Sequence, residues 1–328
     1  MTTVMTTVTL GKALNLALHD ALHDDPRVLI FGEDVGRLGG VFRVTDGLQA
    51  EFSDRRVFNT PLAESTIAGI AVGLAIKGFR PVAEMQFDAF SYPAFNQVTS
   101  NVAKYHTRSG GACPMQLVIR IPYGGHIGAI EHHSESPETY YAHTAGLKVV
   151  TPSTPADAYG LLTAAIRDPD PVIFLEPKAR YYLRQDLDLA VPPLPLDRAR
   201  IAREGTDATV IAYGPTVHVA LAAAETAAPE GTSLEVVDLR SLSPLDIETL
   251  AASVRKTRRA VVVHEAPVFM GLGAEIAARL MHDLFDVLAA PVERVGSATV
   301  PYPPARFEKL FLPDADRVLE AVDRTRQY

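Results

Sequence analysis

A regular alternation of strand-like and helical runs over residues 207–296 constrains this fold more than any other feature of the sequence. Residues 207–214, DATVIAYG, have the apolar character of a buried strand, and residues 215–228 follow with the periodicity of a helix. The pattern repeats and ends with a strand-like run at 291–296. Apolar strands separated by helices form a parallel sheet that is covered on both faces.

The front part of the chain has the same character, although its alternation is less regular. Its strand-like runs, separated by helical stretches, lie at 27–32, 80–85, 115–122, 147–152 and 171–177. Residues 187–205 are rich in proline and charge, which is typical of a linker. We therefore predict two parallel-sheet α/β domains, at 1–186 and 206–328.

Length and charge narrow the classes of function. A chain of 328 residues is long for one core, and its formal net charge of −8 with a pI near 5.7 excludes a basic nucleic-acid or anionic-membrane surface. We expect small molecules and proteins as partners. Cys113 is the only cysteine, and the N-terminus has no signal-peptide pattern, so a reducing cytoplasm is expected.

Residues 59–78, NTPLAESTIAGIAVGLAIKG, predict a helix that has no charged side chain from Ile67 to Ile76 and is therefore buried. Glu64 stands at its entrance. The simpler interpretation is a first-turn acid that complements the helix dipole after Thr60 and Pro61. The alternative is a functional carboxylate at the mouth of a very apolar environment.

Histidines gather in a long glycine-flanked loop over residues 121–138. His132 and His133 lie between Glu131 and Glu135, and His126 is close by in sequence. A metal site, a catalytic role and a polar loop with incidental histidines all remain open, because the spacing matches no helical ligand motif.

Other candidate sites have weaker support. His19 and His23 share one face of a predicted N-terminal helix, where a solvated surface is the simpler interpretation than chelation. The sequence lacks GxSxG, GxxxxGK[ST] and GxGxxG, which disfavours serine hydrolases and nucleotide-binding enzymes. GLGAE at 271–275 begins a predicted helix whose amides offer an anion site.

Several motifs in register resemble one family. They are GEDVG, GGVFRVTDGL, TPLAE, EMQFDAFSYPAFNQ, PYGG, HHSESPE and GLKVVTPSTPADAYGLL. In this order they resemble the β subunit of the thiamine-diphosphate-dependent 2-oxo acid dehydrogenases, in the component that decarboxylates the keto acid. The resemblance implies a pyrimidine-binding domain followed by a transketolase C-terminal-like domain.

The resemblance also implies roles for particular residues. Glu64 would contact the N1′ nitrogen of the cofactor's aminopyrimidine and relay a proton, while Leu62 and Phe90 would contact the cofactor; an ordinary core position is the alternative for Phe90. His133 matches the histidine of the family's H-S-Q-S motif at the substrate entrance, and Glu135 replaces the glutamine.

A potassium ion is usual in this β subunit. The positions that match its ligands, mostly as carbonyl donors, are Leu117, Ala165, Asp168 and Asp170. A plain turn is the alternative interpretation of the last two.

The cofactor's Mg²⁺ and diphosphate are held in this family by a GDG segment followed by Asn-Asn, and no GDG occurs here. The resemblance therefore implies an α subunit that supplies this half of the site, in an α2β2 heterotetramer that acylates a lipoyl acyltransferase core.

Residues 174–178, FLEPK, resemble the branched-chain members, which act in branched-chain amino acid catabolism, more than the pyruvate members. A pyruvate dehydrogenase β subunit, a transketolase or deoxyxylulose-phosphate synthase fragment, and a non-catalytic assembly subunit are the alternatives.

Overall fold

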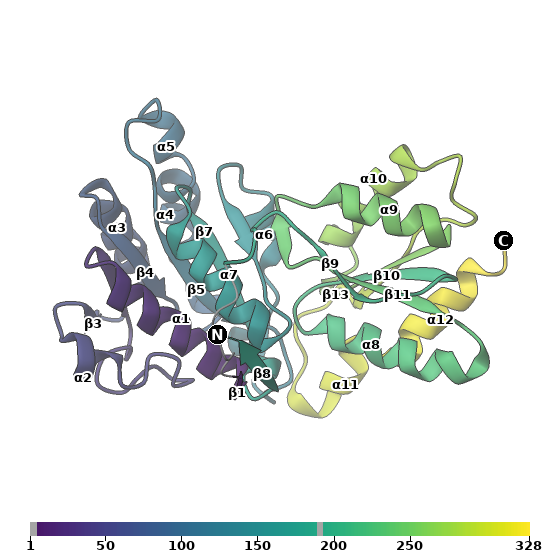
Figure 1. The fold of residues 1–328 in the computed structure, drawn as a ribbon, viewed down its shortest axis with the longest axis horizontal. Helices are drawn as coiled ribbons and strands as arrows, with labels where there is room; N and C mark the ends of the chain where they lie inside the picture. The colour runs from purple at the N-terminus through teal and green to yellow at the C-terminus, as the bar shows by residue number, and fades with distance from the viewer. Residues whose placement is uncertain (1–4, 189–192) are drawn as a thin grey trace. The chain divides into compact units, whose positions relative to one another are not determined.

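The computed structural model describes residues 5–188 and 193–328 of the chain, shown as a ribbon in Figure 1. The chain divides into two compact units. The first contains the chain up to Tyr123 together with Tyr140–Leu196, and the second contains Gly124–Thr139 together with Asp197–Tyr328. The predicted fold class, two parallel-sheet α/β domains, is confirmed.

A parallel sheet forms the centre of the first unit, with its strands in the order β6-β7-β5-β4-β2-β3. The bounds of these strands are β2 Val28–Gly32, β3 Val57–Asn59, β4 Arg80–Glu84, β5 Val118–Tyr123, β6 Lys148–Val150 and β7 Val172–Pro177. β2, β5 and β7 are buried along their whole length, as expected for strands with both faces covered. Each strand-like run predicted for the front half overlaps one of these strands, and β3 was not predicted.

Helices α1 (Leu10–Asp24) and α7 (Pro155–Arg167) pack together on one face of this sheet. Leu14 and Leu18 of α1 are fully buried in the same cluster as Leu161 and Leu162 of α7. Both helices begin with a threonine cap, since Thr9 accepts from the Lys12 amide and Thr154 from the Asp157 amide. The other helices of this part are α2 Leu48–Phe52, α3 Glu64–Ile76, α4 Phe95–Gln97 and α5 Tyr105–Arg108, and α6 (Glu138–Ala142) begins in residues of the second unit and ends in residues of the first.

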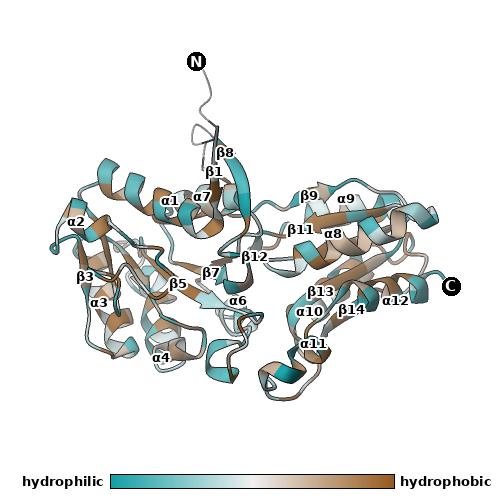
Figure 2. Cartoon of the chain, turned by 90° about the horizontal axis from the view of Figure 1, so that it is seen from below, coloured by the Kyte–Doolittle hydropathy of each residue, from teal (hydrophilic) through white to brown (hydrophobic). Residues whose placement is uncertain are grey.

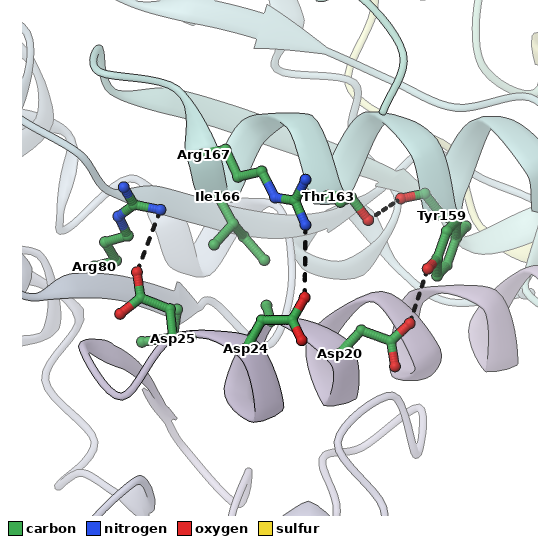
Figure 3. Close-up of a pocket in the computed structure, with 10 residues that line it drawn as sticks. Asp20, Asp24, Asp25, Arg80, Tyr159, Thr163, Ile166 and Arg167 are labelled. Carbon is green, nitrogen blue, oxygen red and sulfur yellow. Dashed lines mark hydrogen bonds and ion pairs between the residues drawn. The ribbon is translucent and has the colours of Figure 1, made fainter. Parts of the chain in front are cut away.

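A cavity of about 270 Å³ lies between the ends of α1 and α7 (Figure 3). A hydrogen bond and an ion pair cross it: the Tyr159 hydroxyl donates to Asp20 at 2.8 Å, and Arg167 pairs with Asp24 at 3.7 Å. Its carboxylates and guanidinium groups thus largely neutralise one another. None of the predicted site residues lines it.

The second unit is built on the strands in the order β14-β13-β10-β11-β9, of which β9 is antiparallel. Figure 1 shows α8 and α12 on one face of this sheet and α9 and α10 on the other, and Figure 2 draws β11 and β13 between them largely in the brown of apolar residues. The bounds are β9 Arg200–Arg203, β10 Ala208–Ala212, α8 Thr216–Ala227, β11 Leu234–Asp238, β12 Ser241–Ser243, α9 Ile247–Thr257, β13 Ala260–Pro267, α10 Leu272–Asp283, β14 Glu293–Ser297, α11 Glu308–Phe311 and α12 Ala315–Thr325.

The structure differs from the predicted domain boundaries in two respects. β9 lies within the predicted linker 187–205, where it pairs with β11, and residues 189–192 of that linker lie outside the described residues. Gly124–Thr139 was predicted to be part of the first domain and belongs to the second unit. A short antiparallel ribbon of β1 (Met5–Thr9) and β8 (Arg184–Asp188) was also not predicted. No helix of the described ranges has the length and apolar character needed to cross a membrane.

Candidate active site

The order of strands in the first unit reverses at β2, which pairs with β3 on one side and β4 on the other. Open parallel sheets bind ligands beyond the carboxyl ends of their strands at such a reversal. Glu33 directly follows β2, and Glu64 begins α3 after the turn that follows β3. Both are buried, with exposed fractions of 6% and 8%. Two acids therefore lie buried at the end of the sheet that is expected to bind a ligand.

Glu64 is the first residue of α3, and no side chain caps this helix. An acid that only complements the helix dipole can remain exposed to solvent. Burying a carboxylate without partners, in contrast, costs free energy. The helix behind it buries Ile67, Ala68 and Ala71. Glu64 is thus buried at the start of a helix that buries apolar residues, as the sequence predicted, and this is consistent with a functional carboxylate.

Glu33 is a site residue to which the sequence analysis gave no role, although it lies within the quoted GEDVG motif. Its Oε1 atom is buried and has no hydrogen-bond partner among the described residues. Burial raises the pKa of this carboxyl, and the negative charges of Glu64 and Asp34 raise it further. The charge of Glu64 therefore acts on the Glu33 carboxyl.

Thr60 provides a second buried polar atom without a partner in the described part of the chain, its Oγ1. Its amide donates to the Gly32 carbonyl at 2.9 Å, which fixes the turn before α3 to the end of β2. Unpartnered carboxylate and hydroxyl oxygens beside Glu64 fit a ligand that brings N–H donors and ring nitrogens. An aminopyrimidine has both.

Phe90 is half-buried in a short turn after β4 and meets Phe87 edge to face, with ring centroids 5.7 Å apart. Phe87 meets Phe42 in the same way at 5.5 Å. Leu62 is 79% exposed in the turn before α3. The predicted pyrimidine contacts therefore lie in an aromatic cluster and on an exposed turn.

A buried ion pair supports the aromatic cluster, and the sequence analysis did not find it. Lys178, which follows β7, binds the carboxylate of Asp88, and both side chains are fully buried. The same ammonium lies over the Phe87 ring, 5.6 Å from its centroid. This pair ties the loop after β4 to the residue that follows β7.

Arg120 of β5 joins the ends of three strands. Its guanidinium donates to Glu176 of β7 at 2.6 and 3.0 Å and to Glu84 of β4 at 2.7 Å. Burial, opposed only in part by the Arg120 charge, raises the pKa of Glu84. Separating these charges inside the protein would be strongly destabilising. The cluster therefore holds β4, β5 and β7 together in the sheet that carries the candidate site.

His133 belongs to the second unit, whereas Glu64 belongs to the first. It ends a short turn, Glu131–His133, and its amide donates to the Ile130 carbonyl at 3.0 Å. Its side chain is half-buried, while His132 is exposed and pairs with Glu131 at 3.2 Å. The two adjacent histidines therefore have different environments.

The predicted potassium ligands have other partners. Lys148 donates to both carboxylate oxygens of Asp168, at 2.7 and 2.8 Å, and pairs with Asp170 at 3.3 Å. The carbonyls of Leu117 and Ala165 each accept a backbone amide. The two acids are thus occupied by an internal ammonium group, and the backbone carbonyls are what this region offers to a cation.

The two helical histidines of α1 do not form a chelating pair. His19 bonds to Asp20 and Glu51, and His23 bonds to Asp24. No cluster of three or more His, Cys, Asp or Glu residues is arranged to hold a metal ion within residues 5–188 and 193–328. The loop histidines likewise form no such cluster there.

Comparison with known proteins places this geometry in a family. The transketolase pyrimidine-binding domain matches residues 6–184, and the transketolase C-terminal domain matches residues 197–318. The pyruvate dehydrogenase E1 component subunit beta of Leifsonia xyli subsp. xyli is 57% identical over 304 residues, which cover 93% of this chain and 90% of the relative. The chain belongs to the E1 β-subunit family of the 2-oxo acid dehydrogenases.

Relatives of this E1 β subunit carry two kinds of substrate name. A 3-methyl-2-oxobutanoate dehydrogenase subunit beta of Mycobacterium tuberculosis is also 57% identical, over 301 residues that cover 92% of this chain and 86% of the relative. A mitochondrial 2-oxoisovalerate dehydrogenase subunit beta of Dictyostelium discoideum is 47% identical, with 93% and 82% covered. The family predicted from the sequence motifs is confirmed.

A solved structure has a fold similar to that of this chain. A split-gene transketolase, described as an inactive beta4 tetramer, superimposes with a TM-score of 0.80 and covers 97% of this E1 β subunit and 98% of its own chain. At 24% identity this likeness concerns the fold alone. The chain is one subunit of a thiamine-dependent 2-oxo acid dehydrogenase.

Proposed function

We propose that this E1 β subunit belongs to a branched-chain-type 2-oxo acid dehydrogenase and contributes the pyrimidine half of its active site. The observation that carries the proposal is the pair of buried acids, Glu64 and Glu33, at the strand-order reversal of a sheet from this family. The buried oxygens without a partner here, Glu33 Oε1 and Thr60 Oγ1, match a nitrogen-rich ring.

Glu64 is the proton-relaying residue of this half-site. Its carboxyl would hydrogen-bond the N1′ nitrogen of the aminopyrimidine and would hold or release a proton there. Leu62 and Phe90 would contact the ring, and the Lys178–Asp88 pair keeps the Phe90 loop in place. The bound thiamine diphosphate supplies the carbanion chemistry through which a 2-oxo acid loses CO₂.

His133 serves the second half-reaction, in which the acyl group passes reductively to a lipoyl group on the acyltransferase core. Opening the lipoyl disulfide leaves a thiolate that needs a proton. Imidazole carries and releases a proton near neutral pH, and it is the side chain best suited to that task.

The other half of the site belongs to an α subunit in an α2β2 enzyme of the cytoplasm. The α subunit would hold Mg²⁺ and the diphosphate of the cofactor, since this sequence has no GDG segment. A potassium ion would bind the carbonyl groups of Leu117, Ala165, Asp168 and Asp170 rather than the two carboxylates, which pair with Lys148.

Reconstitution tests the proposal. The purified chain alone should bind thiamine diphosphate with Mg²⁺ weakly and should not decarboxylate 2-oxo acids, and co-expression with its α subunit should restore both properties. Calorimetry of cofactor binding measures the first and CO₂ release the second. Micromolar binding to the isolated chain would contradict the division of the site, and an assembled enzyme without cofactor would indicate a non-catalytic assembly subunit.

Substrate preference is expected to follow the branched-chain resemblance. The value of kcat/KM for the 2-oxo acids of valine, leucine and isoleucine should exceed that for pyruvate by about tenfold or more, because each additional buried methylene contributes roughly 1 kcal/mol. Initial rates of the assembled enzyme with each acid measure this ratio. A preference for pyruvate moves the enzyme to the pyruvate branch and leaves the family unchanged.

A further inference from the structure

The second unit has its own strand-order reversal, where β10 lies between β11 and β13. The segment Gly124–Thr139 belongs to this unit and contains His133. Two residues at the carboxyl ends of these strands contact the segment: Tyr213, which follows β10, and Glu265 near the end of β13. At the position where such sheets often bind a ligand, the second unit binds a loop of the same chain.

Glu265 makes most of these contacts. Its Oε2 atom accepts the Gly125 amide at 3.1 Å and the Ser136 hydroxyl at 3.5 Å, and its Oε1 atom lies 3.4 Å from the His126 ring. The side chain is only 4% exposed. The Gly124 amide donates to the Glu135 carbonyl at 2.9 Å, so the residues next to Gly125 and Ser136 are also joined to each other.

Glu138 forms the second attachment. Its side chain is fully buried and accepts a hydrogen bond from the Tyr213 hydroxyl at 2.8 Å. Burial raises the pKa of Glu138 to about 7, and the negative charge of Glu265 contributes to the shift. Burying these two carboxyl groups costs free energy, which the hydrogen bonds from Tyr213, Gly125 and Ser136 offset in part.

The glycine pair of the PYGG motif fits the same arrangement. Gly124 has a φ of +81°, and a Cβ atom there would lie 2.6 Å from the Glu265 carboxylate. A Cβ atom at Gly125 would overlap the Tyr302 hydroxyl. Tyr302 donates to Glu308 at 2.6 Å, and Glu308 also accepts the His126 amide at 2.9 Å. The backbone of the segment is therefore shaped to meet side chains of the second unit.

We propose that Glu265, together with Glu138 and Tyr213, is a positioning group that holds the segment Gly124–Thr139 on the sheet of the second unit and so orients His133. Its link to catalysis rests on the transfer role proposed for His133. The positioning itself does not depend on that role.

Amide hydrogen exchange in the assembled enzyme tests the positioning. Glu265→Ala should accelerate exchange of peptides from Gly124–Thr139 by about tenfold or more, while β10 and β13 keep their protection. Glu265→Gln retains an oxygen acceptor for the Gly125 amide and should restore most of the protection. Glu275→Gln is the matched control, because Glu275 is an exposed acid in the first turn of α10, and it should leave the exchange rates unchanged.

Kinetics provide the second readout. Glu265→Ala should weaken reductive acylation of a lipoyl domain by about tenfold or more, and decarboxylation with an artificial electron acceptor should change less than about threefold. The KM for the 2-oxo acid should stay the same. A purely structural role would instead reduce both activities in proportion to the folded fraction.

Unchanged exchange over Gly124–Thr139 in Glu265→Ala overturns the positioning role, whatever the activities. Faster exchange with normal acylation supports the positioning role and counts against the role proposed for His133. If Glu265→Ala does not assemble, Tyr213→Phe replaces it, because this variant keeps the ring and removes only the hydroxyl that binds Glu138. Faster exchange over Ser136–Thr139 then supports the proposal, and normal exchange there overturns it.

Discussion

Decarboxylation by the assembled enzyme should fall by about 10² to 10⁴ when Glu64 is replaced by glutamine, which is the range for loss of a general acid–base group. Glutamine keeps the shape and burial of the side chain at the start of α3, but it cannot take up and release a proton. Two measurements are needed: CO₂ release with an artificial electron acceptor, and the rate at which the C2 proton of the bound cofactor exchanges with deuterium.

The control for Glu64→Gln is Glu275→Gln, which removes the charge of another first-turn acid, in α10. Glu275 is exposed, so a general effect of charge at a helix N-terminus would appear in both variants. We expect the loss only at position 64. Near-normal C2 exchange in Glu64→Gln would reduce Glu64 to a dipole acid, which is the simpler interpretation that the sequence allowed.

Much of the sheet and helix architecture was predictable because its signals are local. The alternation over residues 207–296 predicted β10, α8, β11, α9, β13, α10 and β14, since short continuous apolar runs indicate buried strands and amphipathic helices carry a period in the sequence. The run from Ile67 to Ile76 predicted the helix α3, and Glu64 stood out as the charged residue at its entrance. The helix is buried on one face only, at Ile67, Ala68 and Ala71, whereas Ile76 is 38% exposed, so burial on every side was not confirmed.

Contacts between distant residues left no such signal. Asp88 and Lys178 are 90 positions apart and look like surface charges until the fold buries them together. Glu33 is followed by Asp34 in a glycine-rich loop, a setting typical of solvated acids. The place of Gly124–Thr139 in the second unit depends on Glu265, 140 positions beyond Gly125, and loop sequences do not specify such partners. The short strands β1, β8 and β9 depend on pairing in the same way.

Replacing His133 by alanine should separate the two half-reactions. Glu64 acts through the cofactor ring and is needed in every turnover, whereas a histidine at the substrate entrance faces the keto acid and then the lipoyl disulfide. Loss of the imidazole removes the proton donor for the thiolate, so reductive acylation of a lipoyl domain should weaken by about 10² or more. Decarboxylation measured with an artificial electron acceptor should decline much less.

His132→Ala is the control for His133→Ala, because the two histidines are adjacent but differ in environment. His132 is exposed and pairs only with its neighbour Glu131 among the interactions described, so its loss should do little in either assay. Equal slowing of both assays by His133→Ala would indicate that His133 binds the keto acid rather than protonating the thiolate. Sensitivity at His132 instead would mean that the match to the family's H-S-Q-S motif is shifted by one residue, and the half-buried His133 would then be a structural residue of its turn.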